Sequence, residues 1–148
     1  MVRAGKARYL GASGMYAWQF AKMQHTAELH GWTRFVSMQD QYHLVQRGEE
    51  QEMFPLPADQ NFDGRPLWQD SDKPTIDAVE RIANDRGVSM ATIALARVLK
   101  RPVVDAPIVG ATKEHHLPAA AAALGVTLTD DETKALEEHY VPREPTYF

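Results

Sequence analysis

The feature that most constrains the fold is an alternation of short apolar stretches with longer segments of helical spacing. The letters RYLGAS predict a strand over Tyr9–Ala12, and RFVSMQ predicts a second strand over Phe35–Gln39. Between them, apolar and aromatic residues recur at helical spacing until Gly31, which is a natural helix stop. A strand, a helix and a strand in this order imply parallel strands joined by a right-handed crossover.

The second half of the sequence continues the pattern with more helices. A helix with two prolines is predicted over residues 49–60, before an exposed loop rich in Gly, Pro and Asp. Further helices are predicted over 75–87, 89–102, 113–125 and 129–140, with Gly87 as a stop and Ser89 and Thr129 as N-caps. A third strand is predicted over Ala106–Gly110. We therefore expect one α/β domain over residues 1–148, with about three parallel strands and five to six helices.

Composition excludes several classes of function. A chain of 148 residues with 44% apolar residues is large enough to bury one core. The net charge of −4 is spread over interleaved acids and bases, which argues against nucleic-acid binding. The lack of cysteine excludes disulfides, zinc-thiolate sites, iron–sulfur clusters and thiol catalysis. With no apolar run long enough for a membrane and no signal-peptide core, we expect a soluble, cytoplasmic protein.

Four segments, in order, resemble the C-terminal half of the aldo-keto reductase family, in the bacterial branch similar to potassium-channel β-subunits. They are YLGAS, FVSMQDQYHL, VSMATIALARVLKRPVVDAPIVGATKEHHLPAAAAAL and LTDDETKALEEHY. The resemblance covers nearly the whole chain. It implies a partial (β/α)8 TIM barrel that binds NADP(H) at the C-terminal ends of its strands.

The resemblance also implies that parts of the barrel are missing from these residues. Tyr9–Ser13, Phe35–Gln39 and Ala106–Gly110 would be barrel strands five, six and eight. Strand seven has no counterpart, and the predicted deletion junction lies near residues 60–61. The family's catalytic Tyr, Lys, Asp and His belong to the half that the resemblance does not cover, so we assign no catalytic residue.

Ser13 and Gln39 match the family positions that hydrogen-bond the nicotinamide carboxamide. A hydroxyl and an amide suit that group, which offers one acceptor and two donors. Gly14 stands where the family usually has Asn or Ser, so one contact is lost. Without the resemblance, a serine at the end of a strand such as Ser13 is most often a helix cap.

The turn before the alanine-rich helix is the candidate phosphate site. Backbone N–H groups at a helix start together with a lysine ammonium favour an anion, and in the family this region holds the 2′-phosphate. The candidate residues are Gly110, Thr112, Lys113 and His116. His116 replaces a common Arg, and Ala119 and Ala120 replace usual adenine contacts, so binding could be weakened or lost. The alternative is an ordinary strand-to-helix turn with a solvated lysine.

Three functional hypotheses follow. The first is an NADP(H)-dependent oxidoreductase fragment that keeps part of the cofactor site and is inactive alone. The second is a non-catalytic binding or oligomerisation module that no longer holds nucleotide, and the third is an enzyme completed by a separate chain. Open strand edges predict a homo-oligomer or a rearranged sheet.

Adjacent His115 and His116 point in different directions on a helix, so no metal site is expected. The substrate stays open.

Overall fold

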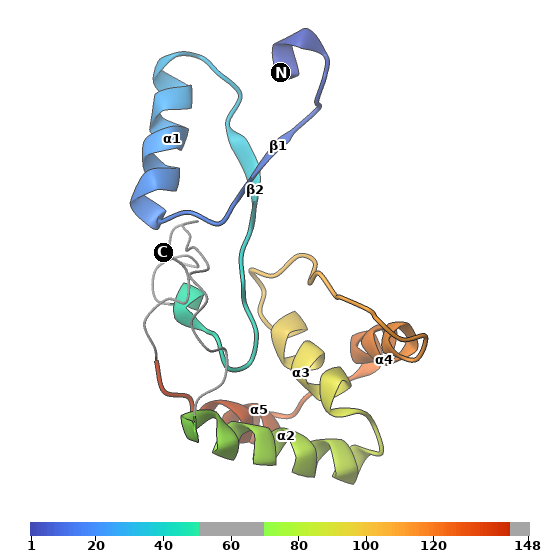
Figure 1. The fold of residues 1–148 in the computed structure, drawn as a ribbon. Coiled ribbons are helices and arrows are strands. Elements are labelled where there is room, and N and C mark those ends of the chain that lie inside the picture. The colour runs from blue at the N-terminus through green and yellow to red at the C-terminus, as the bar shows by residue number, and fades with distance from the viewer. Residues whose placement is uncertain (51–69, 143–148) are drawn as a thin grey trace. The chain divides into compact units, whose positions relative to one another are not determined.

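A computed structural model describes residues 1–50 and 70–142, which belong to two compact units (Figure 1). The first unit contains Met1–Tyr42 and continues from Arg47. The second unit contains the short segment His43–Gln46 and the described residues from 70 to Pro142. Each unit has its own internal packing.

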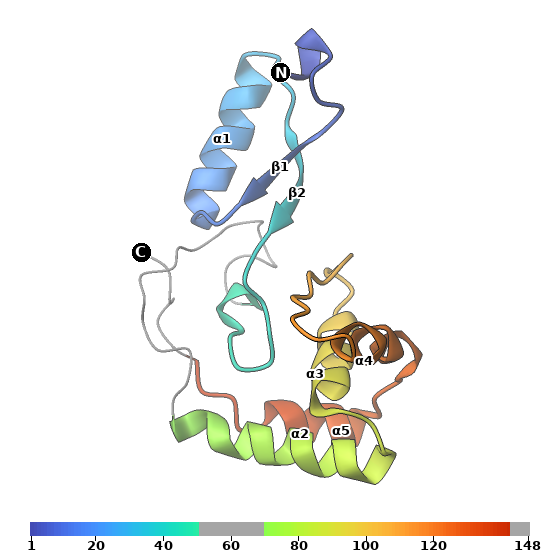
Figure 2. The ribbon, with the colours of Figure 1, turned by 45° about the vertical axis from the view of Figure 1, so that its right-hand side comes forward.

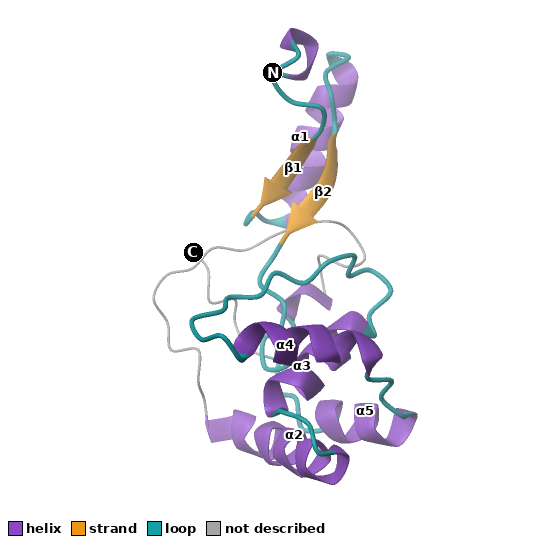
Figure 3. Cartoon of the chain, turned by 90° about the vertical axis from the view of Figure 1, so that its right-hand side faces the viewer, coloured by secondary structure: helices purple, strands orange, loops and turns teal. Residues whose placement is uncertain are grey.

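The first unit is built around two parallel strands. Its elements are the 3-10 helix η1 (Val2–Ala4), β1 (Leu10–Ser13), α1 (Ala17–Leu29), β2 (Phe35–Gln39) and the 3-10 helix η2 (Gly48–Glu50). Figure 3 shows β1 and β2 side by side. Helix α1 connects them and brings the chain back to the end of the sheet where β1 began, so that β2 runs parallel to β1. The predicted strand, helix and parallel strand are confirmed.

Helix α1 is fixed to the start of β2 by one side-chain amide and one ring contact. Gln24 Nε2 donates to the Phe35 carbonyl at 3.0 Å, and Gln24 Oε1 accepts from the Phe35 N–H at 3.0 Å. The buried ring of Phe20 lies 5.8 Å from the Phe35 ring, centroid to centroid. Because these contacts fix both backbone and side chain of one strand residue, the helix sets where β2 begins.

The second unit is a helical assembly, shown from another side in Figure 2. Its elements are η3 (Asp70–Asp72), α2 (Lys73–Arg86), α3 (Met90–Leu99), α4 (His116–Ala122), η4 (Ala123–Gly125) and α5 (Asp130–Glu137). Helix α2 packs against α3 and α5, and α3 packs against α4. The core has nine buried residues: Leu44, Val79, Ile82, Ala83, Ile93, Ala96, Ala123, Leu128 and Leu136.

The predicted helix signals of the second unit are confirmed. Gly87 ends α2 with a left-handed φ of 65°, a conformation that glycine adopts without steric cost. Ser89 Oγ accepts from the Thr92 N–H at 3.1 Å at the start of α3. At the start of α5, Thr129 and Glu132 each accept from the other's backbone N–H, which forms a capping box.

The predicted third strand is wrong. Ala106–Gly110 forms no strand, and Ile108 is 75% exposed. A strand is stable only when a neighbour completes its hydrogen-bond ladder, and none of residues 1–50 and 70–142 provides one here. Residues 1–50 and 70–142 therefore contain two strands and five α-helices. The predicted helix over 49–60, beyond η2, and the junction near 60–61 lie outside the described residues.

An ion pair joins the end of α2 to the start of α5. The guanidinium of Arg86 donates to both carboxylate oxygens of Glu132 at 2.6 Å and to the Thr127 carbonyl at 3.0 Å. The hydrogen bonds from Arg86 lower the pKa of Glu132 from its ordinary 4.5 to about 2, although partial burial opposes the shift. The same contact raises the pKa of Arg86.

This pKa shift predicts an acid-dependent loss of stability. Because the folded-state pKa of Glu132 is depressed, its contribution is present above the unfolded pKa of 4.5 and is lost as the pH falls towards about 2. We expect the urea midpoint to fall less between about pH 6 and about pH 2.5 in Glu132→Gln than in the unchanged chain. Equal falls in the two proteins would contradict the assignment.

Candidate functional site

The carboxyl ends of the two strands bring Ser13 and Gln39 together. They are register partners in the parallel ladder, and the Gly14 N–H donates to the Gln39 carbonyl at 3.3 Å. Register partners present their side chains on the same sheet face. Both residues are exposed, and neither side chain has a hydrogen-bond partner among residues 1–50 and 70–142. A hydroxyl and an amide thus lie side by side and open to a ligand.

On the same face of the sheet, the pair of register partners before Ser13 and Gln39 contains a glycine, so few side-chain atoms project there. Gly11 is the register partner of Ser37, and a Cβ added at Gly11 would lie 2.8 Å from Ser37 Oγ. The serine hydroxyl therefore occupies the space that a side chain at position 11 would take. These partners lie directly before Ser13 and Gln39, so the approach to the pair is lined by small and polar groups.

The candidate phosphate turn lies in the second unit and has a different arrangement from the one expected. Helix α4 begins only at His116, after a turn in which the His116 N–H donates to the Lys113 carbonyl at 3.0 Å. The Thr112 N–H donates to His116 Nδ1 at 3.3 Å, so the imidazole already uses one of the amides that a phosphate would contact. Lys113 is exposed and makes no ion pair within the described part of the chain.

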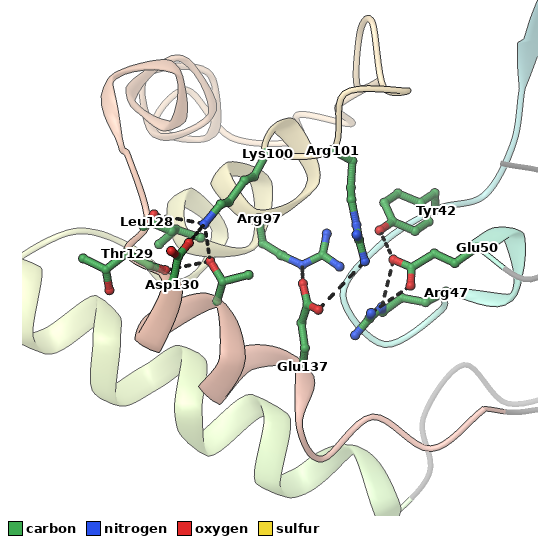
Figure 4. A network of polar contacts seen from close by, with 11 residues as sticks. Tyr42, Arg47, Glu50, Arg97, Lys100, Arg101, Leu128, Thr129, Asp130 and Glu137 are labelled. Atoms are coloured by element: carbon green, nitrogen blue, oxygen red, sulfur yellow. Dashed lines mark hydrogen bonds and ion pairs between the residues drawn. The ribbon is translucent and has the colours of Figure 1, made fainter. Parts of the chain in front are cut away.

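Tyr42, which follows Gln39 in the chain, belongs to a separate polar cluster in the first unit (Figure 4). Its hydroxyl donates to Glu50 Oε1 at 2.5 Å, and Arg47 donates to both Glu50 oxygens at 3.1 and 2.8 Å. Tyr42 and Arg47 are held together by one carboxylate. This cluster explains how η2 is anchored, and the sequence offered no signal for it.

The second unit has its own charged cluster, in which ion pairs link α3 and the residues directly after it to α5 (Figure 4). Arg97, which is 1% exposed, pairs with Glu137, and Arg101 Nη2 lies 3.9 Å from the same carboxylate. Lys100 donates to Asp130, to Thr133 and to the Leu128 carbonyl. These ion pairs and hydrogen bonds link α3 and the residues after it to α5 within one unit, so the cluster is structural.

Within residues 1–50 and 70–142, no group of three or more His, Asp or Glu side chains could hold a metal ion. Over the same residues, no helix has both the length and the apolarity to cross a membrane.

Comparison with known proteins decides the family. The model of the aldo/keto reductase family matches residues 1–67 and 63–141. The chain belongs to the aldo/keto reductase family. Since that family forms (β/α)8 barrels, the β1–α1–β2 unit is part of such a barrel, and the fold is a partial one.

The aldo/keto reductase family assignment is supported by individual relatives. The chain is 36% identical to versiconal hemiacetal acetate reductase of Aspergillus parasiticus, over 97% of this chain and 51% of that protein. It is 38% identical to an aldo-keto reductase of Fusarium vanettenii, over 97% of this chain and 47% of that protein. It is 34% identical to the aldo-keto reductase AMT2 of Alternaria alternata, over 98% of this chain and 47% of that protein. The chain spans about half the length of these curated relatives.

Proposed function

We propose that this chain forms part of an NADP(H)-dependent oxidoreductase and supplies residues that bind the cofactor. The observation that carries the proposal is the register of the parallel strands, in which Ser13 and Gln39 are partners at the carboxyl ends. Ligands of parallel α/β folds bind at these ends. The names of the relatives, which include reductases, support a redox reaction. The lack of cysteine suits a reducing compartment such as the cytoplasm.

The two groups at the strand ends fit the nicotinamide carboxamide. The Gln39 amide can donate to its oxygen and accept from its nitrogen, and the Ser13 hydroxyl can do either. When bound, NADPH supplies a hydride to a carbonyl. The role of Ser13 and Gln39 is to hold the nicotinamide ring by its substituent, with one face open to the substrate.

The Gly110–Lys113 turn fits the 2′-phosphate in part. Within residues 1–50 and 70–142, the Lys113 ammonium has no ion pair, and no atom lies within 4 Å of a Cβ added at Gly110, so both are open to an anion. His116, however, competes with a phosphate for the Thr112 N–H. We infer that the imidazole must turn away for the phosphate to use this donor, which would weaken binding.

The family's reaction requires four catalytic side chains that have no counterpart among the residues of this chain. By the family resemblance, the Tyr, Lys, Asp and His of the reaction have no counterparts here, so we propose that the chain is inactive alone. Carbonyl-dependent NADPH oxidation is expected only when a chain that carries those four residues is added. Turnover by this chain alone would contradict the proposal.

Cofactor binding is tested by calorimetric titration with NADPH and, in parallel, with NADH. We expect saturable binding of NADPH and weaker binding of NADH, because only NADPH has the 2′-phosphate. Gln39→Leu should lower the affinity for both cofactors by about 5–30-fold, since the nicotinamide carboxamide would lose a hydrogen-bond partner. Absence of saturation at millimolar NADPH would overturn cofactor binding.

A second candidate function is a non-catalytic oligomerisation module. It is favoured by exposed apolar residues in the segment that replaces the predicted third strand, where Ile108 is 75% and Val109 39% exposed. Each described strand also has only one neighbour, which leaves edges for pairing. Light scattering would detect a homo-oligomer as a mass that rises with concentration, and a constant monomer mass would exclude it.

A further inference from the structure

A pocket of about 470 Å³ lies at the amino ends of the two strands, away from Ser13 and Gln39. It is formed in the first unit by η1, the second half of α1 and the chain leading into β2. Figures 1 and 3 show η1 at the same end of the strand pair as the last turn of α1. Its volume is in the range of sites for small molecules.

The inner surface of the pocket is apolar. Ala27 is buried, and Leu10 and Phe35 are half-buried where β1 and β2 begin. Met23 and Trp32 are more exposed and form the outer part of the wall. Because exposure increases from the inner to the outer lining residues, an apolar surface stays open to solvent. A ligand with an apolar body would cover it.

The aromatic wall is held in place before any ligand arrives. The backbone N–H of Trp32 donates to the Ala27 carbonyl at 2.7 Å, and the Trp32 ring stacks on the His30 ring with centroids 4.7 Å apart. Arg3 Nη2 donates to the carbonyl of Gly31, which joins η1 to the turn before Trp32. Because the ring is fixed, a flat ligand loses little free energy in ordering it.

Among the described residues that line the pocket, Arg3 and Lys22 have positively charged side chains and none is an acid. Arg3 and Lys22 are both exposed and both belong to the lining. Lys22 has no ion pair within the described part of the chain, and Arg3 contacts a carbonyl. The nearby carboxylate of Glu28 pairs with Arg34 at 3.9 Å instead. The pocket therefore combines an apolar interior with uncompensated positive charge.

We propose that this pocket binds a small amphipathic carboxylate. Its aromatic or aliphatic body lies against Trp32 and Phe35, and its carboxylate pairs with Lys22 and Arg3. Charge complementarity selects this ligand over a neutral apolar molecule, because the two cations would otherwise stay unpaired beside it. The pocket and the proposed nicotinamide contacts lie at opposite ends of the strands, so the two ligands should bind independently.

The test uses 2-naphthoate and its neutral analogue 2-naphthamide, followed by NMR of the Trp32 indole N–H in the 15N-labelled chain. We expect 2-naphthoate to shift this signal saturably and to bind about fivefold or more tightly than 2-naphthamide. Added NADPH should leave the 2-naphthoate titration unchanged. No saturable shift, or equal affinity for the two compounds, would overturn the proposal. Failure of NADPH to bind would leave this result standing.

Variants of Lys22 test the charge without disturbing the wall, because its side chain makes no hydrogen bond or ion pair within residues 1–50 and 70–142. Lys22→Gln should lower the affinity for 2-naphthoate about two- to fivefold, and Lys22→Arg should bind it as tightly as the unchanged chain. The matched control is Lys134→Gln, an exposed lysine of α5 in the second unit, which should have no effect. Equal affinities for Lys22→Gln and the unchanged chain would overturn the role of the cation.

The other occupant to consider is a second copy of the chain. If it covered the pocket, the Trp32 signal would shift with protein concentration alone, and 2-naphthoate would reverse that shift. That result would overturn the small-molecule assignment. A Trp32 signal that is independent of protein concentration and moves only with 2-naphthoate supports it.

Discussion

Leu136→Ala is expected to lower the free energy of unfolding of the second unit by about 2–5 kcal/mol. Leu136 is 0% exposed and belongs to the core that α2, α3 and α5 form around Ile82 and Ile93. Truncation removes apolar contact area and leaves a cavity, because neighbouring helices close only part of the space. Urea denaturation followed by circular dichroism at 222 nm measures the change.

The matched control is Leu124→Ala, which removes the same atoms from the same unit. Leu124 is 78% exposed, so this substitution should change the free energy of unfolding by no more than about 0.5 kcal/mol. The two leucines differ chiefly in burial. If both substitutions had the same effect, the assignment of the core would be wrong.

Lys113→Ala is expected to lower the affinity for NADPH by about 5–30-fold and to leave the affinity for NADH unchanged. The ammonium of Lys113 is exposed and has no carboxylate partner within the described part of the chain, so a phosphate would be its first ion pair. A charge-assisted contact of this kind contributes about 1–2 kcal/mol, which corresponds to that change in affinity. Calorimetric titration with both cofactors gives the two values.

Lys134→Ala is the control for total charge, since it removes one exposed lysine from helix α5. It should leave NADPH affinity within about twofold, because exposed charges at a distance are screened by salt. Unchanged NADPH binding in Lys113→Ala would show that the phosphate lies elsewhere. The proposed contacts of Ser13 and Gln39 would be unaffected by that result.

Local signals predicted the helices well because each signal acts within a few residues. Gly87 ends a helix since its left-handed conformation is open to glycine, and Ser89 and Thr129 begin helices since their hydroxyls accept the first free N–H groups. The strand over Phe35–Gln39 has the predicted bounds. In all these cases the decisive interaction lies near the residue in the sequence.

Features that depend on distant residues were harder to predict. Ala106–Gly110 has the composition of a strand, yet a strand also needs a neighbour. The meeting of Ser13 and Gln39 was foreseeable, because parallel strands align their carboxyl ends. The His116 contact with Thr112 depends on a rotamer, and the pocket near Trp32 depends on three separate segments. No sequence pattern encodes either.

The contact between Gln24 and Phe35 has a consequence for aggregation. An exposed strand invites pairing through its free backbone groups, and proteins suppress such pairing by blocking them. The side-chain amide of Gln24 imitates a peptide group of a neighbouring strand and occupies both the N–H and the carbonyl of Phe35. A foreign strand could not use these two groups without displacing Gln24. Helix α1 thus protects the first residue of β2 from unwanted strand addition.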